Sequence, residues 1–425
     1  MQIRGDKTAR EKSRNRFGLL IAAAVTVTFV LACANANAGE YTGVGPLNKI
    51  KGPPPLLGGA VKFRVDKSNV ETHKDKLTAG LYKQIKEWDR VINVYDTVRD
   101  YKPPVEYQEA TEKYKGSARI NKKGGLENYT AGLPFPDPKT GIEAMYNYEY
   151  KYNGDDFSFT DTDFFIYSTT GKSRLLKGGY NRFAYQGRLF LDPKPTLQTS
   201  DNVELKEVQW LTYPEDVAGL ALLTVRYQDP DKGDDGWMYI PSIRRVRRIS
   251  VAQRGDSFGG TDLTWDDYRG FSGKVSDYTW KIIGKKELIA QYHAVTWKMR
   301  HKNRVPFSED VRYELRPVIV VEGVNKLKDY VYSKRIIYLD ADSWYISAED
   351  LYDRRGTLWK YLEIPWSFDP RNHNMFAYGY CMYDLIGKRS TIISIREKQD
   401  GPLQVLNTGL KVDDFSPSVI QTWGR

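Results

Sequence analysis

The sequence predicts a mainly β protein with flanking helices. From about residue 155 onward, runs rich in Tyr, Phe, Val, Ile, Thr and Trp alternate with turns of Asp, Gly, Lys and Pro, which is the pattern of short strands joined by turns. The segment before residue 155 carries helical signals instead. Aromatic residues make up 13% of the 425 residues, and their amphipathic rings suit either a large aromatic core or the lining of a hydrophobic cavity.

The N-terminus predicts export. Residues 1–18 hold six Lys or Arg against two acids, and the 15 residues from Leu19 to Cys33 carry no charge. Ala36-Asn-Ala38 then provides the small residues of a cleavage site, so we predict that residues 1–38 are a signal peptide removed after Ala38. The apolar run is shorter than the roughly 20 residues that span a bilayer as a helix. This length disfavours the alternative of an uncleaved membrane anchor.

A second interpretation of the leader stays open. Val30-Leu-Ala-Cys33 resembles a bacterial lipobox, in which Cys33 would be lipidated and become the new N-terminus. Leu31 is bulky for its place in that motif, and Ala36-Asn-Ala38 offers an ordinary cleavage site just beyond it. We therefore predict cleavage after Ala38 and keep lipidation of Cys33 as the alternative.

The composition of the mature chain excludes several classes of protein. Cys381 is its one remaining thiol, so no internal disulfide forms and the fold depends on a hydrophobic core. Removing the leader's +4 from the net charge of +10 leaves about +6 (10 − 4), which suits an anionic membrane surface or acidic partners. We expect no nucleic-acid partner for an exported protein. No metal or other cofactor is predicted, because no two of the four histidines have metal-ligand spacing: His73, His293, His301 and His373.

The N-terminal part is predicted to combine a tether with helices. Residues 39–60, which include Gly52-Pro-Pro-Pro55, form the extended tether, and residues 61–154 form a helical and irregular part. A second helix in this part is expected at Thr140, because Thr140-Gly-Ile-Glu143 has the form of a capping box. The first helix is indicated by apolar residues that recur every three or four positions: Leu77, Leu81, Ile85, Trp88, Ile92 and Tyr95.

Residues 155–425 are predicted to form an antiparallel β domain, either a barrel or a sandwich. Hairpin turns are expected at Asp229–Gly236 and Asp353–Gly356. The first turn spaces two acids as in a calcium loop but lacks the rest of that pattern, so we interpret it as a plain turn. Ser416-Pro417 predicts a short terminal helix. The expected strands are Phe157–Tyr167, Val203–Thr212, Ala221–Tyr227, Trp237–Ser250, Tyr278–Gly284, Tyr313–Val321, Tyr330–Leu339, Trp344–Tyr352 and Thr391–Ile395.

Four arginines fall within one of these strands, in Ile240-Pro-Ser-Ile-Arg-Arg-Val-Arg-Arg-Ile-Ser250. The period of two puts Arg245 and Arg247 on one face with Ile243 and Ile249, and Arg244 and Arg248 on the other with Val246. Neither face is purely apolar, so we expect an edge or rim strand rather than a buried one. Two interpretations remain: a solvated edge whose charges prevent aggregation, or a basic rim that meets anionic headgroups or a partner.

Gly255-Asp-Ser-Phe-Gly259 matches the G-x-S-x-G nucleophile elbow of serine hydrolases. That chemistry requires a strand–turn–helix context, whereas the surrounding pattern is antiparallel β and the residues after Gly259 open a helix poorly. We therefore expect Ser257 to be a loop residue and keep a hydrolase as the alternative. The acid pairs Asp266 and Asp267, and Asp161 and Asp163, are expected to be solvated.

The central motif resembles the signature of bacterial outer-membrane lipoprotein-sorting (LolA-like) proteins. The matching residues are Trp237-Met-Tyr-Ile-Pro241, the arginine-rich strand, and Arg254-Gly-Asp-Ser-Phe-Gly-Gly-Thr-Asp-Leu-Thr-Trp-Asp-Asp-Tyr268. Gly125-Leu-Glu-Asn-Tyr129 and Gly132-Leu-Pro-Phe-Pro136 are similar to a larger envelope family of Gram-negative bacteria that is catalogued as a domain of unknown function.

The resemblance implies a fold and a function. The expected fold is an open antiparallel β-barrel with a helical plug, and the expected protein is a periplasmic carrier of lipid or another hydrophobic ligand, including sterol-like ones. Lipidation of Cys33 would attach it to the outer membrane. Implied partners are a resistance-nodulation-division transporter and an outer-membrane protein, and a non-ligand adaptor of such a complex is a further alternative. The aromatic residues that we expect to line a cavity are Trp237, Tyr239, Phe258, Trp265, Tyr268 and Trp280.

Overall fold

The computed structural model describes residues 57–294, 298–302, 305–309, 311–370, 373–377, 379–395 and 405–423. The chain divides into two units, Met1–Thr42 and Gly43–Arg425, and all described residues belong to the second. The predicted signal peptide, with Cys33 and Ala38, and most of the predicted tether lie outside the described residues. Among the helices within the described ranges, none is long and apolar enough to cross a membrane.

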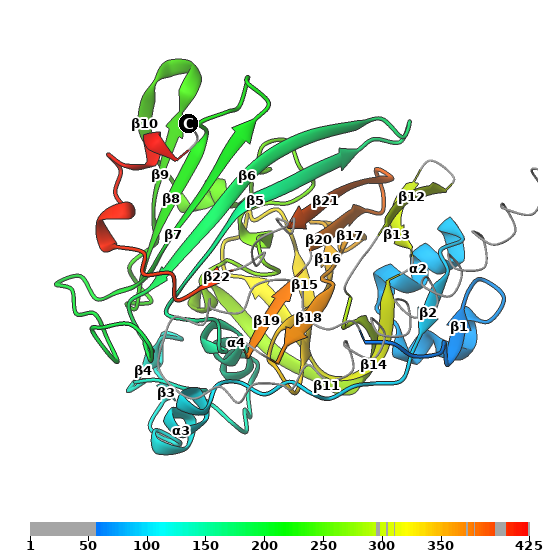
Figure 1. Ribbon diagram of the computed structural model, residues 1–425, viewed down its shortest axis with the longest axis horizontal. Helices are drawn as coiled ribbons and strands as arrows, with labels where there is room; N and C mark the ends of the chain where they lie inside the picture. Colours follow the sequence, from blue (N-terminus) through cyan, green and yellow to red (C-terminus); the bar gives the residue numbers. More distant parts are fainter. Residues whose placement is uncertain are drawn as a thin grey trace, which may run out of the picture. The chain divides into compact units, whose positions relative to one another are not determined.

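One large open sheet of 16 strands organises the described chain (Figure 1). Neighbouring strands of this sheet pair antiparallel, except that β2 (Ile92–Val94) pairs parallel with β14. This arrangement confirms the predicted mainly β architecture. The long strands, in spatial order, are β11 (Tyr278–Gln291), β14 (Arg312–Asn325), β15 (Lys334–Asp340), β16 (Ile346–Tyr352), β17 (Leu358–Glu363), β20 (Gly379–Asp384), β21 (Arg389–Ile395), β5 (Asp156–Tyr167), β6 (Ser173–Ala184), β7 (Val203–Tyr213), β8 (Ala221–Tyr227), β9 (Asp235–Ile240) and β10 (Arg245–Ile249).

Shorter elements complete the fold. β1 (Phe63–Val65) pairs with β2, and β22 (Val405–Leu406) pairs with β5, so the sheet draws strands from both sides of residue 155. Within the described residues the α-helices are α2 (Ala79–Trp88), α3 (Val105–Lys113) and α4 (Gly141–Tyr150). Three small hairpins join β3 (Arg119–Ile120) to β4 (Leu126–Glu127), β12 (Lys298–Lys302) to β13 (Val305–Glu309), and β18 (Trp366–Asp369) to β19 (Asn374–Ala377).

Strand β6 is absent from the predicted strands, because its sequence contains Gly178 and Gly179, which weaken a strand pattern. The structure shows why glycine is required there. A Cβ atom at Gly178 would lie 2.1 Å from the carbonyl oxygen of Trp210, and one at Gly179 would lie 2.3 Å from the Trp210 ring. The neighbouring strand therefore approaches β6 too closely for any larger residue.

The predicted helix from Leu77 to Tyr95 is too long. Helix α2 ends at Trp88, because the next residue, Asp89, adopts a left-handed conformation with φ of 53°. Ile92 is nevertheless buried, since β2 turns Ile92 and Val94 toward the core. The second helix is confirmed, and the capping box between Thr140 and Glu143 opens α4 as predicted.

The two faces of the sheet are covered by different parts of the chain. On one face, Asp350 of β16 accepts the N–H groups of Ala79 and Gly80 at 2.9 and 2.8 Å, which docks the start of α2. Lys360 of β17 instead donates its Nζ to the carbonyl of Asp262 at 2.6 Å, in the segment that follows β10. Residues 360 and 361 point to opposite faces, and Tyr361 touches α2 at Gly80. Helix α2 and the segment around Asp262 therefore lie on opposite faces.

The C-terminal segment closes an apolar cluster on β6–β9. Phe415 and Ile420 are 1% and 0% exposed and pack with Val208, Leu223 and Tyr239. The predicted terminal helix begins later than expected, as the single 3-10 turn η8 (Ile420–Thr422) after Ser416-Pro417.

Candidate functional site

The signature residues Arg254–Tyr268 form a compact segment on the face of the sheet opposite α2. The segment starts at the end of the 3-10 helix η4 (Val251–Gly255), passes a bridge between Ser257 and Thr264, and enters the 3-10 helix η5 (Trp265–Asp267). Asp267 Oδ2 accepts the N–H of Thr264 at 2.8 Å, which caps η5. We call this segment the plug.

Buried ion pairs hold the plug together and join it to the sheet, the first within the plug and the second between plug and sheet. Arg254 Nε lies 2.6 Å from Asp266 Oδ1, and both side chains are buried. Asp267 lies 3.2 Å from Arg335 of β15 and accepts the Tyr332 hydroxyl at 2.7 Å. The prediction that Asp266 and Asp267 are solvated is therefore wrong. Asp266 is 4% exposed and Asp267 is 0% exposed, and each forms an ion pair with a buried arginine.

Two further acids are also tied into the interior. Asp262 of the plug lies 2.6 Å from Arg389 and accepts the Thr391 hydroxyl at 3.0 Å, both on β21. Asp163, predicted to be solvated, is 1% exposed, and the side chain of Asp161 lies outside the described residues. Asp262 and Asp267 thus anchor the plug to two different strands, β21 and β15.

Ser257 lacks the setting of a hydrolase nucleophile. Its hydroxyl donates to the carbonyl of Thr261 at 2.6 Å, and it lies between the 3-10 helix η4 and a tight turn rather than between a strand and an α-helix. His293 is bound by Glu314 and Asp100, and His373 Nδ1 lies 2.9 Å from the carbonyl of Lys102. The side chain of His301 lies outside the described residues. The context that the elbow chemistry requires is absent at Ser257.

The six aromatic residues predicted to line a cavity lie in three separate groups. Phe258, Trp265 and Tyr268 of the plug pack together, with ring centroids 4.7 Å apart for Phe258 and Trp265. Trp280 packs on Tyr278 and Phe271 and donates its Nε1 to the Val275 carbonyl at 2.8 Å. The third group belongs to the apolar cluster under the C-terminal segment and contains Trp237 and Tyr239.

A cleft of about 590 Å³ opens beside the plug, where several turns gather at one end of the sheet. Tyr330, whose hydroxyl donates to Asp266 at 2.8 Å, joins the cleft to the plug. None of the six predicted aromatic residues is among the described residues that line it. The lining residues are Gly255, Asp256, Asp329, Tyr330, Val331, Asp353, Arg354, Arg355, Trp359 and Ile386.

The walls of this cleft combine apolar residues, two arginines and three aspartates, Asp256, Asp329 and Asp353. Ile386 in the β20–β21 turn is 55% exposed, and with Val331 and Trp359 it provides apolar surface. The exposed hairpin tip between β16 and β17 contributes Arg354 and Arg355. Arg354 forms a 3.0 Å ion pair with Asp329, whereas Arg355 has no ion pair with any described residue. The hairpin itself confirms the turn predicted at Asp353–Gly356.

The arginine-rich stretch forms a hairpin rather than the single strand that was predicted. β9 ends at Ile240, a 3-10 turn follows over Pro241–Ile243, and Arg244 adopts a left-handed conformation with φ of 51°. Arg244 therefore does not share a strand face with Arg248, contrary to the period-two prediction. The stretch does end on an edge strand, since β10 closes one side of the sheet order. The arginines are exposed at four positions: Arg244, Arg245, Arg247 and Arg248.

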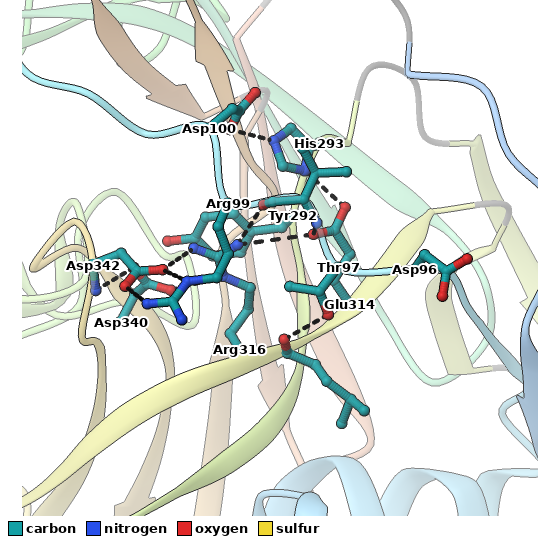
Figure 2. A network of polar contacts seen from close by, with 12 residues as sticks. Asp96, Thr97, Arg99, Asp100, Tyr292, His293, Glu314, Arg316, Asp340 and Asp342 are labelled. Atoms are coloured by element: carbon teal, nitrogen blue, oxygen red, sulfur yellow. Dashed lines mark hydrogen bonds and ion pairs between the residues drawn. The ribbon is translucent and has the colours of Figure 1, made fainter.

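A second polar cluster secures the extended segment 95–104, which we call the strap (Figure 2). His293 is 5% exposed and lies between Glu314 of β14, at 2.7 Å, and Asp100 of the strap, at 3.0 Å. Burial alone would lower the pKa of His293, but the hydrogen bonds to Asp100 and Glu314 outweigh it and raise this pKa. Arg99 of the strap donates through Nε to Asp342 at 2.8 Å. No local pattern predicts this cluster, because its members come from distant segments.

The chain is similar to several known proteins. The chain is 28% identical over 414 residues to an uncharacterized protein of Pseudomonas aeruginosa, PA3922, and the match covers 91% of this chain and 86% of that protein. A crystal structure from Desulfovibrio piger, of a protein in the DUF1329 family, is similar over 66% of this chain and 97% of its own, with 17% identity and a TM-score of 0.47. A LolA superfamily protein from Nitrosomonas europaea, NE2245, is similar over 66% of this chain and 98% of its own, with 15% identity and a TM-score of 0.41.

The decisive comparison is with a protein family. The family model described as "Protein of unknown function (DUF1329)" matches residues 64–421, which span almost all of the chain after the predicted leader and tether. This match confirms the expected membership in a family catalogued by a domain of unknown function. The chain belongs to the DUF1329 family.

Proposed function

We propose that the protein is an exported, periplasmic carrier that binds a lipid-like molecule, with an apolar chain and an anionic headgroup, in the cleft beside the plug. The observation that carries this proposal is an apolar wall beside an arginine without an ion pair in one cleft. Val331, Trp359 and Ile386 offer an acyl chain a surface to cover. Arg355, which has no ion pair with any described residue, offers its guanidinium group to an anionic headgroup, whereas Arg354 is already paired with Asp329.

The size of the cleft supports the same proposal. Its volume of about 590 Å³ falls within the roughly 300–1,000 Å³ typical of ligand pockets. The leader predicted from the sequence supports export, and the resemblance to lipoprotein-sorting proteins supports hydrophobic cargo. We further propose that a membrane transporter of the resistance-nodulation-division class and an outer-membrane protein exchange ligand with this carrier.

The test is lipid extraction from protein purified out of the envelope, followed by mass spectrometry. Ile386→Asp places a carboxylate on the apolar wall, which repels an anionic headgroup and disfavours an acyl chain. We expect the amount of co-purified lipid per protein to fall about tenfold, which corresponds to roughly 1.4 kcal/mol of lost affinity. Val105→Asp is the matched control, because Val105 and Ile386 are both 55% exposed and Val105 lies on α3, away from the cleft lining.

Each outcome distinguishes a class of function. Lipid that remains bound to Ile386→Asp would place the ligand elsewhere in the protein. Absence of lipid from the wild-type protein, with recovery of a membrane partner, would favour the adaptor. Ester turnover that disappears in Ser257→Ala would favour the hydrolase despite the geometry around Ser257.

A further inference from the structure

The edge strand β10 is a surface that the proposed carrier function does not use. Its residues pair in register with β9 alone, from Arg245 opposite Ile240 to Ile249 opposite Gly236. No other described strand pairs with it, so its outer edge presents backbone N–H and C=O groups that remain available for another strand.

At the opposite side of the sheet, the edge strand is covered by other segments of the chain. There the long strand β11 is contacted by the start of α4, where a Cβ atom at Gly141 would lie 2.5 Å from the amide nitrogen of Lys281. Lys286 of β11 also donates its Nζ to the carbonyls of Asp75 and Leu77, at 3.0 and 2.8 Å. The N-terminal part thus covers β11, whereas no described segment covers the edge of β10.

The charges around β10 are also unbalanced. Arg248 forms an ion pair with Asp235, but no acid among the described residues lies within ion-pair distance of Arg244, Arg245 or Arg247. This differs from the buried arginines of the plug face, such as Arg254 and Arg335, which are each paired with carboxylates. The edge therefore lacks the acidic partners that the interior supplies.

The faces of the sheet to which the β10 arginines point indicate what kind of partner can bind this edge. Val246 packs against the apolar cluster under the C-terminal segment, so Arg245 and Arg247 point to the other face of the sheet, and Arg248 shares the face of Val246. A flat bilayer laid on one face of the sheet would meet only part of this set. A strand added along the edge would place alternate side chains beside Arg245 and Arg247 while its backbone pairs with β10.

We propose that β10 is a docking edge for an extended acidic segment of a partner protein, which adds as a further strand with its carboxylates beside Arg245 and Arg247. This inference is independent of the cleft. The backbone pairing provides affinity, and the arginines select an acidic sequence over a basic one.

The test uses a fluorescent ten-residue peptide that alternates glutamate and threonine, with binding to the full-length mature protein followed by anisotropy. We expect Arg245→Gln/Arg247→Gln to weaken binding about tenfold, since it removes the two cations that would lie beside the carboxylates of the peptide. The matched control is Lys281→Gln/Lys285→Gln, which removes two exposed cations from the covered strand β11 and should change binding less than about twofold. Circular dichroism checks that both variants fold.

Backbone pairing is tested on the peptide. In an extended chain the N–H groups of all glutamates point to one edge and those of all threonines point to the other. N-methylation of one residue type should therefore abolish binding, and N-methylation of the other type should leave it nearly unchanged. Equal effects of the two modifications would overturn strand addition in favour of simple charge attraction.

Two further results would also overturn the proposal. One is binding to phosphatidylglycerol vesicles, lost in Arg245→Gln/Arg247→Gln, without any binding of the acidic peptide; this result would assign the edge to a membrane surface. The other is binding to neither probe, which would make the arginines a solvated guard against aggregation.

Discussion

His293 lies between two carboxylates that belong to different parts of the chain, Asp100 on the strap and Glu314 on β14 (Figure 2). Glu314 is also 2.6 Å from Arg312, so one of the two acids that the histidine faces already has a cation, whereas Asp100 pairs with no other cation of the described residues. The hydrogen bonds to both acids raise the pKa of His293 against the effect of its burial. Burial alone would raise the pKa of Glu314, but its contacts with His293 and Arg312 outweigh burial and lower this pKa.

A raised pKa makes the stabilisation by His293 depend on pH. The contribution is fully present below the ordinary value of 6.5 and is lost as the pH rises through the higher pKa of the folded protein. We expect the free energy of unfolding of the wild type to exceed that of His293→Gln most clearly near pH 6, and the difference to shrink toward pH 9. Urea denaturation across this range measures it, with His73→Gln as the control on an outer histidine that stacks on Phe63. A difference that stays constant with pH would contradict the prediction.

At the scale of elements, the plug is held to the sheet by charge pairs. The sequence predicts β8 well, because Ala221–Tyr227 has the composition of a strand and a turn follows. It does not predict that Asp266 and Asp267 are buried, because Arg335 is 68 positions from Asp267 and only the fold brings them together. The cleft was missed for the same reason, because its lining residues come from four segments that are far apart in the sequence. These segments contain Gly255, Val331, Arg355 and Ile386.

Arg254→Met should show how much the buried ion pair inside the plug stabilises the protein. The substitution leaves Asp266 buried without its arginine, and breaking a buried pair in this way costs about 3–5 kcal/mol of unfolding free energy. Arg174→Met is the matched control, because the 3.1 Å pair of Arg174 with Asp216 is exposed at 47% and 67% and such pairs contribute about 0–1 kcal/mol. Chemical denaturation measures both variants. Similar losses in the two would mean that the plug is not held by this pair.

At the scale of the whole molecule, the fold class and the family could be predicted from sequence, whereas several boundaries could not. The fold class was predicted from the alternation of strands and turns, and the family was predicted from the long signature around Trp237–Tyr268. Helix α2 was extended too far because Ile92 continues a helical spacing while lying on a strand. β6 was missed because the close approach of Trp210, which no single-strand pattern reveals, requires two glycines there.

The predicted leader determines where the mature protein begins. Export with cleavage after Ala38 should yield a mature protein that begins at Gly39, because Ala36-Asn-Ala38 is the small-residue site that follows the apolar run. Intact-mass measurement of protein recovered from the envelope checks this directly. A mass that corresponds to an acylated Cys33 would instead establish a lipoprotein.

The ion pairs between the plug and the sheet should make this protein resist amphiphiles such as detergents. An acyl chain can take the place of a leucine in an apolar pocket, because the two are chemically alike. An acyl chain cannot replace the carboxylate that pairs with a buried guanidinium group, as Asp267 of the plug does with Arg335 of the sheet. An amphiphile that enters the cleft beside Tyr330 would therefore not displace the plug from the sheet.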